Sequence, residues 1–157
     1  MIDSLLPRGQ GQAVLRSPVT PVRELSAFGI GMRLLATVGD TGEVCTTFEY
    51  TLPAGAQGPQ PHYHRNTTEA FYVLKGKLNF LMEDQWIVLE PGSFLSVTPG
   101  TTHAFRNGGE EGVVFLGFAT PGGHERFLEQ LVALARQESA GPCDTFCVPD
   151  AMPVGVA

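Results

Sequence analysis

Apolar and polar side chains alternate along residues 43–52, which is the clearest strand pattern in the sequence. The positions that share the more apolar face are Val44, Thr46, Phe48, Tyr50 and Leu52. The opposite face carries mainly Glu and Thr. Because successive side chains of a strand point to opposite faces, this alternation predicts a strand with one buried face.

Shorter runs of the same kind predict further strands on both sides of this one. They lie at residues 13–19, 30–38, 69–74, 77–82, 85–89, 93–98, 103–107 and 113–119. The connections are short and rich in residues that favour turns, for example the run from Gly39 to Gly42. Many short strands joined by tight turns, with no helices between them, indicate an antiparallel sandwich or barrel.

One segment, residues 124–137, has a helical pattern instead. Its apolar side chains recur at helical spacing, and Gly141-Pro142 follows as a stop signal. We expect this helix to pack on the outside of the barrel; a lid over the barrel mouth and a dimer contact are the alternatives. The chain length suits one domain, predicted over residues 13–138, with a flexible arm at 1–12 and a coil tail at 139–157.

Charge and composition argue against several classes of partner and location. The net charge is −6 and lysine occurs only at Lys75 and Lys77, so neither nucleic acid nor an anionic membrane is an expected partner. The chain shows no signal-peptide pattern and no apolar run long enough to span a bilayer. Cys45, Cys143 and Cys147 form no disulfide framework, and the last two are interpreted as incidental thiols. We therefore expect a cytoplasmic protein.

Three of the four histidines, together with one glutamate, have a spacing that suits a metal ion. In an extended strand, His62 and His64 would lie on the same face, about 6.6 Å apart. Glu69 follows after residues that can turn the chain, and His103 opens a strand directly after Pro99-Gly100. Three neutral imidazoles and one carboxylate suit a divalent transition metal.

These four candidate ligands would leave two positions of a six-coordinate ion open to water, oxygen or a chelating substrate, which is typical of a catalytic site. The sequence predicts one divalent transition metal per chain. Fe, Mn, Ni, Co and Zn all accept this ligand set. The fourth histidine, His124, is expected to be a surface or capping residue at the start of the helix, with a position at the barrel mouth as the alternative.

Four aromatic residues are candidates for the walls of an apolar pocket around the metal. They are Phe48, Tyr50, Phe71 and Phe105. By strand alternation Phe71 faces the same way as Glu69, and Phe105 the same way as His103. For each aromatic residue taken singly, packing in the core is the alternative interpretation.

The histidine-containing segments resemble the two sequence motifs of the cupin superfamily. The first motif is present as Gly55, six residues, His62-x-His64, four residues, Glu69, six residues and Gly76. The second is present as Gly92, followed by Pro99-Gly100-x-x-His103-x-x-x-Asn107. Two departures occur: the gap after Gly55 is one residue longer than usual, and Thr98 replaces a customary proline. Neither departure removes a ligand.

This resemblance implies an all-β fold, a double-stranded β-helix (jelly roll) in which His62, His64, Glu69 and His103 bind one metal. It also implies a homodimer. Residues 118–128, with their Pro-Gly-Gly turn leading into a helix, resemble the small quercetin 2,3-dioxygenase-like cupins more specifically.

The expected function is therefore a metal-dependent oxygenase that acts on a small, metal-chelating substrate such as a flavonol or a diketone. In such a reaction Glu69 would serve as the general base. Two alternatives stay open. One is an isomerase or lyase that uses the metal as a Lewis acid, and the other is a barrel that binds a small ligand without turnover.

Overall fold

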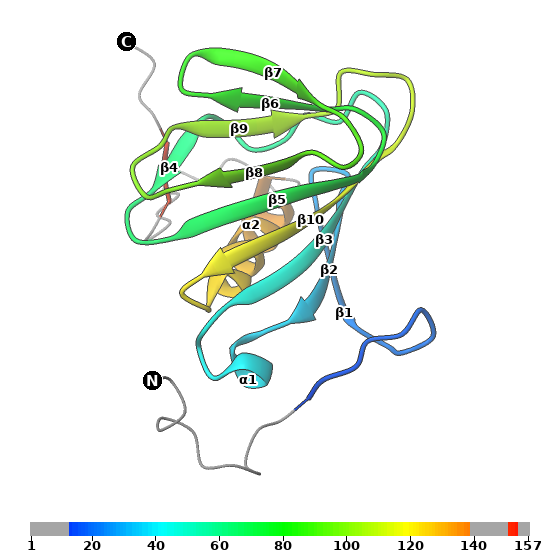
Figure 1. Ribbon diagram of the computed structural model, residues 1–157, viewed down its shortest axis with the longest axis vertical. Coiled ribbons are helices and arrows are strands. Elements are labelled where there is room, and N and C mark those ends of the chain that lie inside the picture. Colours follow the sequence, from blue (N-terminus) through cyan, green and yellow to red (C-terminus); the bar gives the residue numbers. More distant parts are fainter. Residues whose placement is uncertain (1–12, 139–150, 154–157) are drawn as a thin grey trace.

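Two antiparallel sheets pack face to face in the computed structural model, which describes residues 13–138 and 151–153 (Figure 1). The six-stranded sheet contains, in order, β1 (Arg23–Ala27), β2 (Ile30–Ala36), β3 (Thr46–Leu52), β10 (Val113–Thr120), β5 (Thr68–Lys75) and β8 (Phe94–Val97). The five-stranded sheet contains β11 (Ala151–Pro153), β4 (His62–His64), β9 (His103–Arg106), β6 (Leu78–Met82) and β7 (Gln85–Leu89). The all-β, jelly-roll prediction is confirmed.

The strands predicted between residues 30 and 119 are present, most of them within two residues of the expected bounds. The strand predicted over residues 13–19 is wrong. Ser17 and Thr20 instead close a turn through their side chains and backbone, and Val19 is 90% exposed. Pro18 within that turn and Pro21 directly after it lack the N–H groups that a strand would use, and the first strand starts only at Arg23.

The strand predicted over residues 43–52 starts three residues later than expected, at Thr46. The run from Gly39 to Gly42, expected to be a turn, falls largely within a short helix, α1 (Val38–Thr41). Gly42 and Glu43 then both take positive φ angles, of 64° and 70°, and redirect the chain. Val44 is consequently 66% exposed, not buried as the alternation predicted, whereas Thr46, Phe48, Tyr50 and Leu52 are buried as expected.

Part of the predicted coil tail forms a strand. Residues Ala151–Pro153 pair with β4 along the edge that faces away from β9. Strand pairing of this kind uses backbone groups that an edge strand otherwise leaves exposed, and a hydrophobicity pattern carries no signal for it. The rest of the tail, including Cys143 and Cys147, and the arm predicted at residues 1–12 lie outside the described residues.

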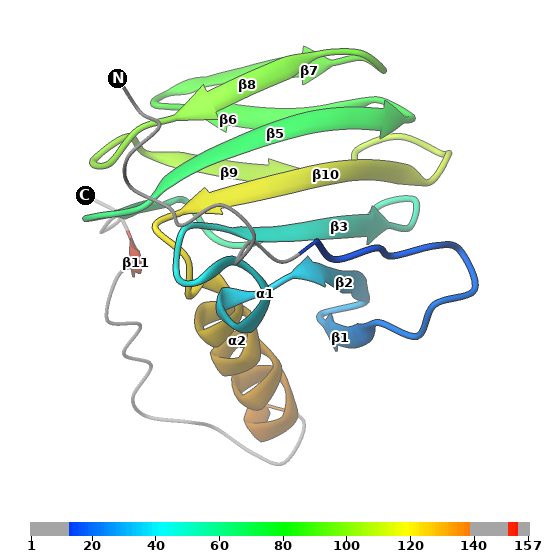
Figure 2. The same cartoon turned by 60° about the horizontal axis from the view of Figure 1, so that its bottom comes forward.

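Helix α2 (His124–Glu138) packs outside the sheets, against β1 (Figure 2). Leu128 and Val132 on its inner face are buried in the core. Phe127 and Leu131 lie over the opening of the barrel, so the helix also covers the mouth. Within the described residues no helix is long and apolar enough to cross a membrane.

The core lies between the two sheets and is rich in aromatic residues. Phe71, Phe80 and Phe115 are at most 1% exposed, and Phe71 contacts Phe80 at a tilt and Phe115 edge-on. Glycine at position 117 makes room for the Phe48 ring, since a Cβ there would lie 1.9 Å from it. Each fully buried Phe stabilises the fold by about 1.5–3 kcal/mol. This packing fixes β5, whose N-terminal end carries Glu69.

Candidate metal centre

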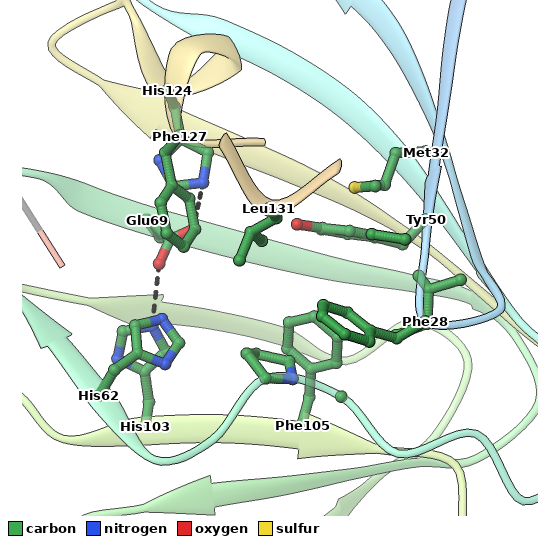
Figure 3. Close-up of a pocket in the computed structure, with 14 residues that line it drawn as sticks. Phe28, Met32, Tyr50, His62, Glu69, His103, Phe105, His124, Phe127 and Leu131 are labelled. Atoms are coloured by element: carbon green, nitrogen blue, oxygen red, sulfur yellow. Dashed lines mark hydrogen bonds and ion pairs between the residues drawn. The ribbon is translucent and has the colours of Figure 1, made fainter. Parts of the chain in front are cut away.

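The structure brings His62, His64, Glu69 and His103 together at one end of the barrel interior. Each offers one ligand atom, these atoms all lie within 4.8 Å of one another, and all four residues are buried. Both histidines of β4 are joined to β9 through the strand pair His62–His103, and Glu69 enters from β5 in the opposite sheet. Residues from both sheets therefore build the cluster (Figure 3).

The local structure explains why these side chains converge. His62 and His64 alternate with the less buried Tyr63, so the extended β4 directs both imidazoles inward. The turn before His103 contains Gly100 at a φ of 84°, and the N–H of Gly100 donates to the carbonyl of His64 at 2.8 Å. That hydrogen bond fastens the start of β9 to β4 and so fixes the spacing of the imidazoles.

The Glu69 carboxylate is the centre of a set of short polar contacts with the imidazoles. Its Oε2 lies 2.9 Å from Nε2 of His64 and 2.9 Å from Nε2 of His103. Its Oε1 lies 3.2 Å from Nε2 of His124, the first residue of α2. Both carboxylate oxygens are thus engaged by imidazoles.

Backbone carbonyls orient two of the rings. Nδ1 of His62 lies 2.8 Å from the carbonyl oxygen of Gln60, and Nδ1 of His103 lies 2.9 Å from that of Thr101. A neutral imidazole that donates its Nδ1–H to a carbonyl leaves the Nε2 lone pair for a metal, and such partners are the usual support of metal-binding histidines. The donor atoms therefore fit one transition-metal ion.

The cluster is strongly polarised. Burial alone would raise the pKa of Glu69, but the charge of His124 and the hydrogen bonds from His103 and His64 outweigh it and hold that pKa well below its usual range. For His103, burial is outweighed by its hydrogen bond to Glu69 and by the carboxylate charge, so its pKa is raised. Burial, assisted by the neighbouring His103, lowers the pKa of His62 to about 4. His62 is neutral at pH 7, as a metal ligand must be.

His62, Glu69, His103 and His124 form one wall of a pocket, and the other walls are almost entirely apolar (Figure 3). The apolar or aromatic residues that line it are Ala27, Phe28, Ile30, Met32, Tyr50, Pro59, Phe105, Phe127 and Leu131. Among the described lining residues there is no Lys or Arg. Tyr50 directs its hydroxyl into the pocket, and burial together with the Glu69 charge raises the pKa of this phenol, so it stays protonated.

Two of the four aromatic residues predicted to line the pocket do so, namely Tyr50 and Phe105. The other two do not. Phe48 is fully buried beneath the ring of His124, at a centroid distance of 5.3 Å, and Phe71 packs deeper in the core against Phe80. Both are therefore core residues. The prediction failed because strand alternation gives the face on which a side chain lies but not its depth along the barrel axis.

Several residues at the site were not predicted as pocket residues. His124 is buried at the barrel mouth and not at the surface, so the alternative position given for it is the one observed. Phe127 and Leu131 follow from the apolar stripe of α2 once the helix is placed over the mouth. Phe28 reaches the pocket from the β1–β2 turn with a φ of 53°, and no sequence pattern indicates this.

Comparison with known proteins agrees with this architecture. Residues 48–118 match the family model described as the cupin domain. An RmlC-like cupin from Shewanella frigidimarina has a similar structure, with a TM-score of 0.57 and 17% identity over 68% of this chain and 88% of that one. At that identity the likeness shows the fold alone.

Two curated relatives share shorter segments. Over 45 residues the chain is 44% identical to quercetin 2,3-dioxygenase of Bacillus subtilis, which covers 29% of this chain and 13% of that protein. Over 72 residues it is 38% identical to glucose-6-phosphate isomerase of Thermococcus gammatolerans, which covers 41% of this chain and 38% of that protein. The matches therefore span well under half of either relative.

Proposed function

This chain carries a cupin domain, and on that premise we propose that it is a metal-dependent oxygenase for a small, largely apolar substrate with adjacent oxygen donors. The substrate class is that of flavonols and 1,2-diketones. His62, His64, Glu69 and His103 would hold one divalent transition metal. Such an ion acts as a Lewis acid and, where it is redox-active, allows reaction with molecular oxygen.

The observation that carries the proposal is the contrast between the walls of the pocket. One wall holds the Glu69 carboxylate and the imidazoles of His62, His103 and His124, and nearly all of the rest is aromatic or aliphatic. A planar aromatic compound with two neighbouring oxygens would place those oxygens at the cluster and its rings against Phe105, Phe127 and Leu131. The 45-residue segment that is 44% identical to quercetin 2,3-dioxygenase supports the same class of reaction.

Tyr50 and Glu69 would make different polar contacts with the substrate. The Tyr50 hydroxyl points into the pocket and stays protonated, so it would donate a hydrogen bond to a substrate oxygen. Glu69 would accept the proton of a substrate hydroxyl. Because imidazoles engage both of its oxygens, Glu69 must first release one of these contacts.

A sugar-phosphate isomerase is the second candidate, favoured by the segment shared with the Thermococcus enzyme. The pocket argues against it. A phosphate group needs cationic partners or several backbone N–H donors, whereas no Lys or Arg occurs among the described residues that line the pocket. A non-catalytic barrel that binds a small apolar ligand is compatible with the same walls, so only turnover separates it from an oxygenase.

The test is oxygen uptake by protein reconstituted anaerobically with Fe(II), Mn(II), Co(II) or Ni(II). A panel of flavonols and 1,2-diketones is then added with air-saturated buffer. The proposal predicts stoichiometric oxygen consumption with at least one metal, and no consumption by His62→Ala treated in the same way.

The other outcomes identify the alternatives. Conversion of a compound without oxygen uptake indicates Lewis-acid isomerase or lyase chemistry. A rise in melting temperature with a flavonol but no conversion indicates a binding protein. Either result, obtained with every metal in the series, contradicts the oxygenase proposal.

A further inference from the structure

His124 contacts the side of the Glu69 carboxylate that faces away from the other imidazoles. Nε2 of His124 lies 3.2 Å from Oε1, whereas His64 and His103 each lie 2.9 Å from Oε2 (Figure 3). The two oxygens therefore have separate partners. His124 does not belong to the group of ligand atoms that converge within 4.8 Å of one another.

The ring of His124 is held in place by aromatic packing. It stacks on Phe48 with an interplanar angle of 19° and a centroid distance of 5.3 Å. Phe127, one helical turn later, contacts it at 5.1 Å, and the residue is only 6% exposed. This enclosure fixes the direction in which Nε2 points.

The backbone that carries His124 is anchored independently of the metal cluster. The N–H of Gly123 donates to Oγ1 of Thr46 at 3.1 Å. The carboxylate of Glu125 accepts hydrogen bonds from the N–H of Val38 at 2.9 Å and from the hydroxyl of Thr46. The first turn of α2 is thus tied to α1 and β3, so the imidazole is positioned before any metal binds.

We propose that His124 is a positioning residue that holds Oε1 of Glu69, so that the carboxylate presents only Oε2 to the metal. This inference rests on the proposed metal site. A carboxylate can ligate through one or both oxygens, and a donor fixed on one oxygen favours ligation through the other. Ligation through one oxygen keeps two positions of a six-coordinate ion open for a chelating substrate.

The test compares variants of His124 by their binding of Co(II), which also reports coordination through its visible absorption. His124→Phe keeps a ring on Phe48 but removes the donor, and His124→Gln restores an N–H donor. Removal of a partner that orients a ligand weakens metal binding by about 10- to 100-fold. We expect this loss, with an altered Co(II) spectrum, for His124→Phe and largely restored affinity and spectrum for His124→Gln.

Two further variants exclude a general effect on the fold. His124→Leu is a second donor-free variant, and the melting temperature of each metal-free protein is measured alongside. A double-mutant cycle with Glu69→Gln tests whether His124 acts through Glu69. The proposal predicts that His124→Phe lowers Co(II) affinity much less in the Glu69→Gln background than in the wild type.

The outcomes separate this inference from the proposed function. If the wild type binds Co(II) and His124→Phe binds it with the same affinity and spectrum, the positioning role is wrong. Equal losses in both backgrounds also contradict it. If the wild type binds no Co(II), the metal site and this inference fail together. Metal binding that depends on His124 but supports no oxygen uptake leaves the inference intact and refutes only the oxygenase.

Discussion

The two ends of the barrel interior are built from the same strands but have opposite character. On β5, Glu69 lies in the polar cluster, while Phe71 and Val73, on the same face of the strand, lie in a dry core. On β9, His103 lies in the cluster, and Phe105, two residues later on the same face, belongs to the apolar wall of the pocket. Strand alternation is identical at both ends, so the difference comes from what faces each side chain across the barrel.

This contrast indicates that one end of the barrel interior stabilises the fold, whereas the other holds the candidate metal site. The core end buries large apolar side chains, which stabilises the fold directly. The cluster end buries an ionised carboxylate among imidazoles, and buried charges cost desolvation that their mutual attraction only partly offsets. The cluster is therefore poorly explained as a stabilising device, and changes at the two ends should have different consequences.

The largest expected effect follows from removing a candidate ligand. His103→Ala should abolish stoichiometric metal binding, because three ligands remain and Glu69 loses a hydrogen-bond partner. The metal-free variant should still unfold cooperatively. Tyr63→Ala is the matched control, since Tyr63 lies on β4 between two candidate ligands but on the other face. Metal content and urea unfolding measure the two effects. If His103→Ala lost its stability while its folded fraction still bound metal, the cluster would serve the fold and not metal binding.

At the core end, Phe115→Ala should lower the free energy of unfolding by about 3–5 kcal/mol. Phe115 is fully buried and contacts Tyr50, Phe71 and Phe105. Phe94→Ala, at a site that is 64% exposed, should change it by less than about 0.5 kcal/mol. The folded fraction of Phe115→Ala should still bind metal. Similar losses for the two variants, in urea titrations, would show that the core is not where the structure locates it.

A smaller effect is expected where α2 is fastened to the barrel. Glu125→Gln should destabilise the protein by about 1–3 kcal/mol at neutral pH, because the carboxylate accepts hydrogen bonds from Val38 and Thr46. Burial would raise the pKa of Glu125, but these hydrogen bonds outweigh it and lower that pKa.

The sign of the pH dependence follows from the lowered pKa. The contribution of Glu125 is present above the usual carboxyl pKa and is lost as the pH falls through the lower pKa of the folded state. Since Gln does not titrate, the wild type and Glu125→Gln should converge in stability at acid pH. A stability difference that stays constant from neutral to acid pH would argue against the carboxylate contacts.

The smallest effect is expected for Tyr50→Phe. This change removes one hydroxyl from the pocket and leaves the cluster and core packing in place. Loss of one neutral hydrogen bond corresponds to about 1 kcal/mol, which is roughly fivefold in KM for a chelating substrate. Metal affinity should not change. Weakened metal binding in Tyr50→Phe would mean that the apolar wall and the cluster are not independent.

The sequence carried most of the information about the fold and the candidate ligands. Alternation gives strands such as β7 to the residue, and the spacing of His62, His64 and Glu69 follows from one short strand and one turn. Such patterns depend on local geometry, which a single sequence displays. For the same reason the buried face of β3 was predicted correctly from Thr46 onward.

The errors at the candidate site and in the C-terminal tail lie where the structure depends on contacts between separate segments of the chain. His124 reaches Glu69 only because α2 folds back over the barrel mouth, and β11 forms only by pairing with β4. Whether Phe71 lines the pocket or the core depends on Phe80 across the barrel and on Phe115 of the neighbouring strand β10. All of these partners lie on other strands or helices, so the periodic pattern of a single segment does not reveal them.

The central claim is that the buried histidine–glutamate cluster binds one transition metal. The most direct test is the metal content per chain of tag-free protein, measured by plasma mass spectrometry for the wild type and for His62→Ala. We predict one Fe, Mn, Ni, Co or Zn per wild-type chain and none in the folded variant. A folded wild type that contains no metal, even after reconstitution, would contradict this account.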